Sequence, residues 1–216
     1  MLALFARPVC SPCLRALFAR PVGTAADRAR CDEIRQLARE AWRIELSTEP
    51  AMMASLRLLR VGRAEIDQHR DGISITSPLA LALVKTRLFD RRQFPAAESS
   101  ATTGQLRDFA AITAPTPAYL WLVSQGNRRA QQIGAGRACL RTNLAASAAG
   151  LALHPNQQAL QEYAQVAGPY RALPALLDAP APGHTVQKLA RLGSPPAGSA
   201  APGPAPRRGL ARQLAL

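Results

Sequence analysis

The chain has 216 residues, of which 48% are hydrophobic and 43 are alanine, while aromatic residues make up only 5%. This composition fits a globular protein of one domain or two small ones, and it excludes collagen-like and fully disordered chains. The net charge is +13, yet 25 of the 27 basic residues are arginines spread along the whole chain, which favours codon bias over a nucleic-acid site.

The first 26 residues contain a perfect repeat, in which Ala3–Val9 recurs as Ala16–Val22. Two copies cannot build a solenoid, which needs at least about three stacked units. Arg7 and Pro8 interrupt the apolar core that a secretory signal requires. We therefore expect residues 1–26 to be a disordered or non-homologous extension. No apolar run approaches the ~20 residues that cross a bilayer, so a cytoplasmic protein without a membrane partner is expected.

Ordered structure is predicted from Asp27 onward. Apolar residues at helical spacing between Asp27 and Leu46 predict a helix, with acidic residues near its positive end. Thr48 followed by Pro50 is typical of a helix start and predicts a second helix over Ala51–Arg60. Residues 62–78 show no single periodicity. After them we expect a helix over Pro78–Leu88, a polar loop over Phe89–Thr103 and a short helix over Leu106–Ile112.

The clearest predicted strand is Ala118–Val123, which is apolar on both faces, as a central strand covered by helices is. We expect Trp121 to be buried there. A long helix should follow through about Ala149, and small residues in it, including Gly134 and Gly136, are expected to let two helices pack closely. The larger apolar residues of this helix and the residues just after it fall on one stripe: Ile133, Leu140, Leu144, Ala148 and Leu151.

The last third of the chain predicts a second strand over His184–Leu192. Five prolines within residues 195–206 exclude a helix or a central strand there. We therefore expect a Pro-rich arm over residues 194–216, which carries Arg207 and Arg208.

The four cysteines are too few for a disulfide scaffold. Cys10 and Cys13 have the spacing of a redox or metal half-site, but no second such pair follows and the histidines are isolated. Because a structural zinc site needs four ligands, we expect reduced, incidental thiols and no metal site.

Three groups of short stretches occur along the chain in a fixed order. The first runs from Ala41–Leu46 through Leu59–Gly62 to His69–Ile73. The second comprises Thr116–Val123, Ala135–Ala138, Asn143–Ala146, Gly150–Leu151, Pro155 and Gln158–Tyr163. The third comprises Pro182–Gln187, Ala190–Gly193 and Pro204–Arg208. In order and spacing they resemble the nitroreductase family of FMN-dependent enzymes, in particular its long, Acg-like branch, over most of residues 38–212.

The resemblance implies an α+β fold, in which helices flank an antiparallel sheet and FMN lies at the junction of two similar lobes. It also implies two-electron reduction of a small electron acceptor, a nitro compound or a quinone, with NAD(P)H as donor and hydride passage through flavin N5. The flavin carries the chemistry in such enzymes, while the protein orients and tunes it. No catalytic side chain is therefore expected, and the fourteen acidic residues show no paired-carboxylate motif.

By the same resemblance, the loop residues Pro155, Asn156, Gln157 and Gln158 bring backbone amides to the flavin ring, where donors stabilise charge on the reduced ring. Arg207 and Arg208 match the terminal basic pair that contacts the FMN phosphate, which suits a planar guanidinium. The alternatives are an ordinary helix-to-helix connection for the loop and a solvated tail for the arginine pair.

Long members of this branch carry a first lobe ahead of the segment that starts at Ala41, and its motifs do not occur here. The chain therefore resembles the C-terminal portion of such a protein, with a nitroreductase-like domain portion over residues 27–193. A second lobe or a homodimer would complete the flavin site, and without completion the chain would be a truncated, inactive oxidoreductase.

Two alternatives belong to other classes: a small basic nucleic-acid-binding protein and a non-functional remnant. The dispersed arginines and the lack of a recognised nucleic-acid-binding motif disfavour the first. A salt titration separates it from a flavoprotein, because phosphate-driven DNA binding weakens steeply with ionic strength.

Overall fold

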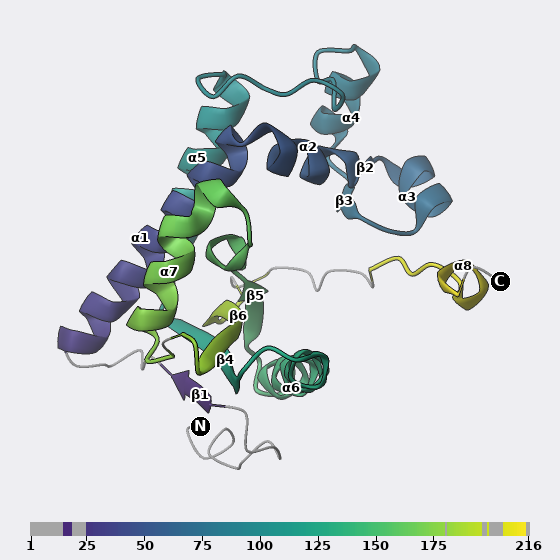
Figure 1. The fold of residues 1–216 in the computed structure, drawn as a ribbon. Helices are drawn as coiled ribbons and strands as arrows, with labels where there is room; N and C mark the ends of the chain where they lie inside the picture. Colours follow the sequence, from purple (N-terminus) through teal and green to yellow (C-terminus); the bar gives the residue numbers. More distant parts are fainter. Residues whose placement is uncertain (1–14, 19–24, 180, 196–197, 199–204, 215–216) are drawn as a thin grey trace. The chain divides into compact units, whose positions relative to one another are not determined.

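The computed structural model describes residues 15–18, 25–179, 181–195, 198 and 205–214 (Figure 1). The chain divides into two compact units. Unit 1 comprises Met1–Glu45 and Thr103–Ser199, and unit 2 comprises Leu46–Thr102 and Ala200–Leu216. The domain portion expected over residues 27–193 thus contains parts of both units, and each is described by itself.

Unit 1 is built on a four-stranded antiparallel sheet in the order β1-β4-β6-β5. Its strands are β1 (Arg15–Phe18), β4 (Ala118–Gln125), β5 (Ala152–Pro155) and β6 (His184–Gly193). β4 and β6 pair from Ala118 opposite Leu192 to Gln125 opposite His184, with a shift in register between Leu122 and Val123. Both predicted strands are therefore confirmed, and the fold is mixed α+β as expected.

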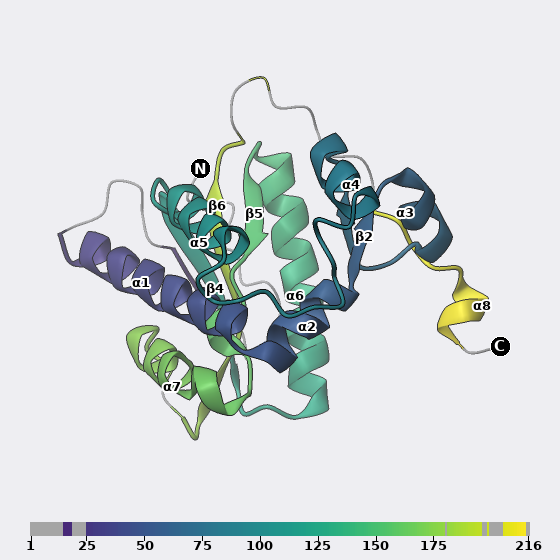
Figure 2. The ribbon, with the colours of Figure 1, turned by 90° about the horizontal axis from the view of Figure 1, so that it is seen from above.

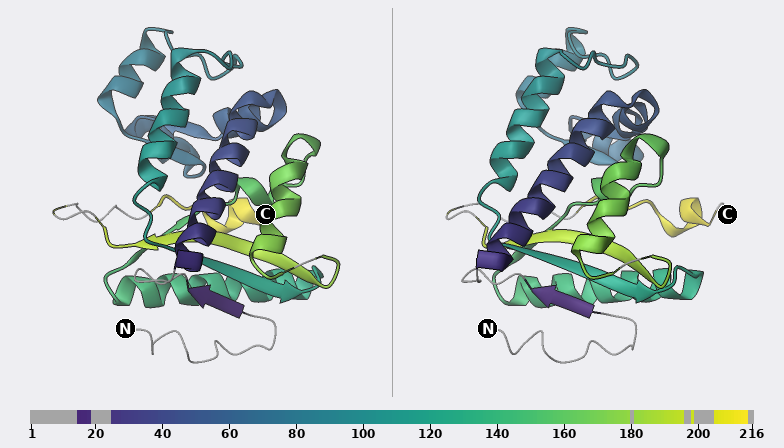
Figure 3. Two further views of the ribbon diagram at one scale, coloured as in Figure 1. Left: turned by 90° about the vertical axis from the view of Figure 1, so that its left-hand side faces the viewer. Right: turned by 60° about the vertical axis from the view of Figure 1, so that its left-hand side comes forward.

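The two faces of β4 are covered by different helices, because successive strand residues point to opposite sides. Tyr119, Trp121 and Val123 join a buried cluster with residues of α1 (Ala25–Ser47) and α7 (Ala167–Leu176). Leu120 and Leu122 pack instead with α6 (Arg129–Ala148). Figure 3 shows α1 and α7 on one side of the sheet and α6 on the other. Trp121 is only 2% exposed, which confirms its predicted burial.

Helix α1 confirms the helix predicted from Asp27 and lies between α5 (Ser100–Thr113) and α7 (Figures 2 and 3). Its buried residues Ile34 and Ala41 recur at helical spacing. Its partly polar side meets α5, where the Trp42 ring stacks on Phe109 with ring centroids 5.5 Å apart. The predicted helix over Leu106–Ile112 is thus the C-terminal half of a longer one.

Helix α6 turns its larger apolar residues outward. Ile133, Leu140 and Leu144 share one stripe as predicted, yet they are 53%, 60% and 61% exposed. The buried residues of this helix are Ala135, Ala138, Thr142 and Ala146. These small side chains let the helix pack against the sheet. The close helix–helix packing expected at Gly134 and Gly136 is wrong, because a Cβ at either glycine would meet no atom within 4 Å.

Strand β1 lies inside the segment expected to be a disordered or non-homologous extension. Arg15–Phe18 pair with β4, with Arg15 opposite Val123 and Phe18 opposite Leu120. One edge of β4 faces β6, and β1 satisfies backbone groups along the other edge. The structure thus describes four residues of this segment as a strand, which does not bear on whether the segment is a non-homologous extension. Residues 1–14 and 19–24, which include Cys10 and Cys13, lie outside the described residues.

Unit 2 alternates short helices and strands: α2 (Glu49–Arg57), β2 (Leu59–Val61), α3 (Arg63–His69), β3 (Ile73–Ile75) and α4 (Pro78–Lys85). The helix predicted over Ala51–Arg60 ends early, because Leu59 and Arg60 pair in parallel with β3. Gly72 precedes β3 with φ of 70°, and a Cβ there would lie 2.1 Å from the Leu58 carbonyl oxygen, so this turn excludes any side chain.

The remaining elements are short. α4 confirms the helix predicted from Pro78, although it ends at Lys85 rather than Leu88. Two 3-10 turns, η2 (Gln158–Leu160) and η3 (Ala164–Val166), lead into α7. In the arm, α8 (Leu210–Gln213) follows the arginine pair.

Candidate functional site

The predicted flavin loop is fixed to the central part of the unit 1 sheet. β5 pairs with β6 as far as Pro155, which lies opposite Ala190. The Asn156 backbone N–H then donates to the Leu189 carbonyl oxygen at 2.9 Å. The Leu189 N–H donates in turn to Oε1 of Gln157 at 2.8 Å. The loop therefore follows a strand, β5, and not a helix. Where its backbone leaves β6, the side chain of Gln157 continues the hydrogen bonding to that strand.

Asn156 is the most unusual residue of this loop. It is 1% exposed, and neither Nδ2 nor Oδ1 of its carboxamide has a hydrogen-bond partner among the described residues. Oε1 of Gln158 is also buried without such a partner. An unpaired buried polar group costs about 1–3 kcal/mol, and most buried polar groups are paired. The loop thus holds a carboxamide that needs one donor and one acceptor from a further partner.

A cavity of about 620 Å³ begins at the residue before the loop, where His154 of β5 lies opposite Arg191 of β6. Arg191 Nε donates to His154 Nδ1 at 3.2 Å, and its Nη1 donates to the Ile112 carbonyl oxygen at 2.6 Å. Burial lowers the pKa of His154, and the Arg191 charge lowers it further. The imidazole therefore stays neutral at neutral pH and accepts the guanidinium hydrogen bond. The volume lies in the range of small-molecule sites.

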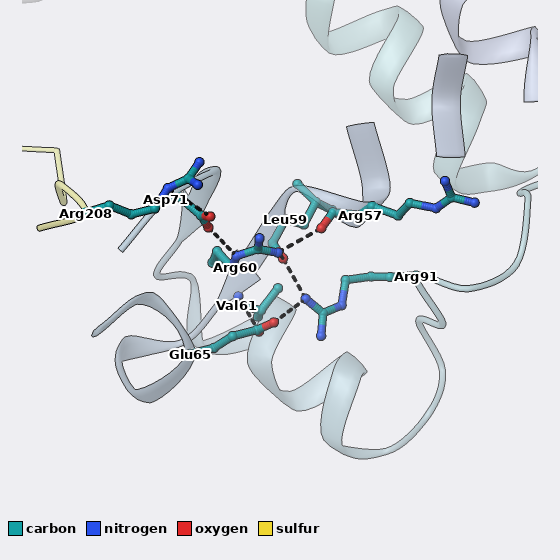
Figure 4. A network of polar contacts seen from close by, with 8 residues as sticks. All are labelled: Arg57, Leu59, Arg60, Val61, Glu65, Asp71, Arg91 and Arg208. Carbon is teal, nitrogen blue, oxygen red and sulfur yellow. Dashed lines mark hydrogen bonds and ion pairs between the residues drawn. The ribbon is translucent and has the colours of Figure 1, made fainter. Parts of the chain in front are cut away.

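The second group of predicted site residues lies in unit 2. Nε of Arg208 is 3.5 Å from Oδ2 of Asp71, whose Oδ1 accepts a 2.8 Å hydrogen bond from Nε of Arg60 (Figure 4). The hydrogen bond from Arg60 lowers the pKa of Asp71, with a smaller contribution from the charge of Arg208. Arg207 is exposed, and its guanidinium has no hydrogen bond or ion pair to any residue that the structure describes. Arg208 is thus held by a carboxylate, whereas no described residue pairs with the guanidinium of Arg207.

The predicted residues therefore form two groups. Pro155, Asn156, Gln157 and Gln158 lie together at the end of β5 in unit 1, and Arg207 and Arg208 lie together in unit 2.

Sequence reasoning also missed the ion pair between Arg91 and Glu65 in unit 2. Nη1 of Arg91 is 2.7 Å from Oε1 of Glu65 and donates to the Leu59 carbonyl oxygen at 2.7 Å (Figure 4). Oε2 of Glu65 accepts from the Val61 N–H at 2.8 Å. Partial burial raises the pKa of Glu65, but the bonds from Arg91 and Val61 outweigh it and hold the pKa below its usual value. The basic run near Arg91 was the only signal, and it does not reveal a partner 26 residues away.

Cysteine and metal chemistry gain no support from the geometry. Cys31 and Cys139 are free thiols, and burial raises the pKa of Cys31. Within the described ranges, no three His, Cys, Asp or Glu side chains gather as a metal site would require. Likewise, no described helix combines the length and apolarity needed to span a membrane.

No family model, no curated protein and no solved structure matches this chain.

Proposed function

We propose that this chain is an FMN-dependent NAD(P)H oxidoreductase of the nitroreductase type, in which the loop Pro155–Gln158 binds the flavin ring. The proposal combines the resemblance of the three groups of stretches with the properties of the loop itself. The chain is an α+β protein with an antiparallel sheet, which is compatible with that family.

The observation that carries the proposal is the buried, unpartnered carboxamide of Asn156. The pyrimidine edge of a flavin presents an N–H donor beside carbonyl acceptors. A carboxamide presents the complementary acceptor and donor, so the residue fits this group. Because Nδ2 and Oδ1 of Asn156 are both buried, the low local dielectric would strengthen their hydrogen bonds to a flavin.

FMN supplies two-electron transfer from NAD(P)H to a quinone or a nitroarene when it is bound. The loop residues of this chain orient the ring, and the hydrogen bond between Gln157 and Leu189 holds the loop on β6. Arg207, whose guanidinium is unpaired within the described chain, has more donors available for a phosphate than Arg208, which is paired with Asp71. A second lobe or a second copy of the chain supplies the remaining contacts.

The test is an FMN titration of the full chain and of Asn156→Leu, followed by flavin fluorescence. Leucine has a similar shape and removes the unpaired amide, so the flavin-free variant should melt at or above the temperature of the wild type. Its FMN affinity should fall at least about tenfold, since two buried hydrogen bonds are lost.

The matched control is Asn143→Leu, which makes the same change on the exposed side of α6. It should bind FMN like the wild type. A wild-type chain that does not quench FMN either alone or with a complementing lobe, or an Asn156→Leu variant that binds FMN with unchanged affinity, would refute the proposal.

A further inference from the structure

A second cavity, of about 720 Å³, lies wholly within unit 2, between α2, β2 and the segment that follows α4. Five arginines line it: Arg57, Arg60, Arg87, Arg91 and Arg92. Only two acidic residues, Glu65 and Asp90, share this lining, and Asp71 pairs with Arg60 from outside it, which leaves an excess of two positive charges. So concentrated a positive charge in a concave site attracts anions strongly.

Two of the five guanidiniums are held in place by the protein. Arg91 is fixed by Glu65 and by the Leu59 carbonyl oxygen. Arg60 is fixed by Asp71 and by the carbonyl oxygens of Arg57 and Leu59 (Figure 4). These bonds use some of the N–H donors of each guanidinium and fix the direction of the remaining N–H groups. This part of the cavity wall is therefore preorganised.

The other three guanidiniums, those of Arg57, Arg87 and Arg92, make no hydrogen bond or ion pair to the described residues. In Figure 4 the guanidinium of Arg57 extends away from Asp71 and from Glu65. Asp90, the remaining acidic residue of the lining, accepts from the backbone N–H of Arg92 at 2.9 Å. The cavity therefore presents three arginine side chains whose charges no described carboxylate pairs.

Arg87 occupies a backbone position that favours glycine. It follows α4 with φ of 60°, in the left-handed region. Its N–H donates to the Val84 carbonyl oxygen and the Leu88 N–H to that of Leu83, which is the hydrogen-bond pattern of a Schellman helix end. Glycine is usual at this position because an L side chain is strained there. Arg87 nevertheless occupies this position on the cavity wall.

We propose that this cavity binds a small molecule with a diphosphate or triphosphate group. Arginine forks match phosphate oxygens in geometry and charge, and several unpaired forks suit an anion with several negative charges better than a single phosphate. The partly buried Phe89 and the buried Leu56 line the same cavity and offer an apolar wall for the rest of the ligand. The volume of this concave site is in the range that suits a small ligand.

The test is calorimetric titration of the full chain, without flavin, with inorganic pyrophosphate at about physiological ionic strength. Pyrophosphate should bind at one site per chain and more tightly than inorganic phosphate. Arg87→Gly and Arg92→Gln should each weaken it about tenfold or more, because each removes a charge-assisted contact. Arg87→Gly should also leave the melting temperature unchanged or raised, since glycine relieves the strain at this position.

Arg171→Gln is the matched control, because it removes one charge from an exposed arginine of α7 in unit 1. It should leave pyrophosphate affinity nearly unchanged. The proposal is overturned if pyrophosphate does not bind, if Arg171→Gln weakens binding as much as Arg87→Gly does, or if a single-stranded oligonucleotide binds and excess pyrophosphate does not displace it.

Discussion

The backbone N–H of Leu189 donates to the side-chain Oε1 of Gln157, 2.8 Å away, and so ties the candidate flavin loop to the buried strand β6. Leu189 has no exposed surface. Its N–H therefore has no access to bulk solvent, and the glutamine takes the place that a neighbouring strand would fill.

Replacing Gln157 by leucine should destabilise unit 1 by about 1–3 kcal/mol, because it leaves the buried Leu189 N–H without an acceptor. Urea unfolding measures the change. Gln158→Leu is the control, since Oε1 of Gln158 accepts no hydrogen bond from the described residues. An equal loss of stability in both variants would show that the Gln157 bond does not matter.

Trp121→Ala should cost on the order of 3–5 kcal/mol, because it empties the largest buried side-chain position of β4. Trp42→Ala should cost less, since Trp42 is only partly buried and stacks on Phe109 at the side of α1. Chemical unfolding of both variants checks the order. A larger effect at Trp42 would contradict the placement of the core.

The orientation of α6 predicts opposite outcomes on its two sides. Leu140→Gln should leave stability nearly unchanged, because Leu140 is 60% exposed. Ala146→Leu should destabilise the protein by about 1–3 kcal/mol, because Ala146 is fully buried against the sheet. Thermal melts distinguish the two variants. If only Leu140→Gln lowered the melting temperature, the side of α6 that carries Ile133, Leu140 and Leu144 would face the core.

The ion pair between Glu65 and Arg91 predicts a pH dependence of stability. The folded protein holds the pKa of Glu65 below its usual value, so the charged form favours folding at neutral pH. That contribution is lost as the pH falls through the lowered pKa, below about 4.3, the usual value for glutamate.

Glu65→Gln should therefore be less stable than the wild type at neutral pH, and the gap should close in acid. Circular dichroism melts from about pH 7 to pH 3 follow this difference. A gap that stays constant over that range would contradict the role of the charge.

The apolar patterns of the sequence were enough to predict α1 and β4, and a weaker alternation indicated β6. They did not reveal which side of α6 is buried, because its larger apolar residues resemble a core stripe. The burial of Ala138 and Ala146 depends on how near the sheet lies, and the helix sequence does not encode that distance. Strand β1 was missed because its pairing with β4 gives four residues an order that their own pattern does not indicate.

For the candidate site, too, some features could be predicted from the sequence and others depend on packing. The position of the loop followed from the resemblance, but the burial of Asn156 depends on elements packed around it. The arginine cavity was not predicted, because β2 and the segment after α4 bring together residues from distant parts of the chain, such as Arg57 and Arg91.

The most direct test of the proposed function is the reduction of FMN by NAD(P)H in the presence of the full chain, with a quinone or a nitroarene as acceptor. The wild-type chain, alone or with a complementing lobe, should accelerate turnover over free FMN, and Asn156→Leu should abolish that acceleration while Asn143→Leu retains it. Turnover no faster than with free FMN, or acceleration that persists unchanged in Asn156→Leu, would contradict the proposed function.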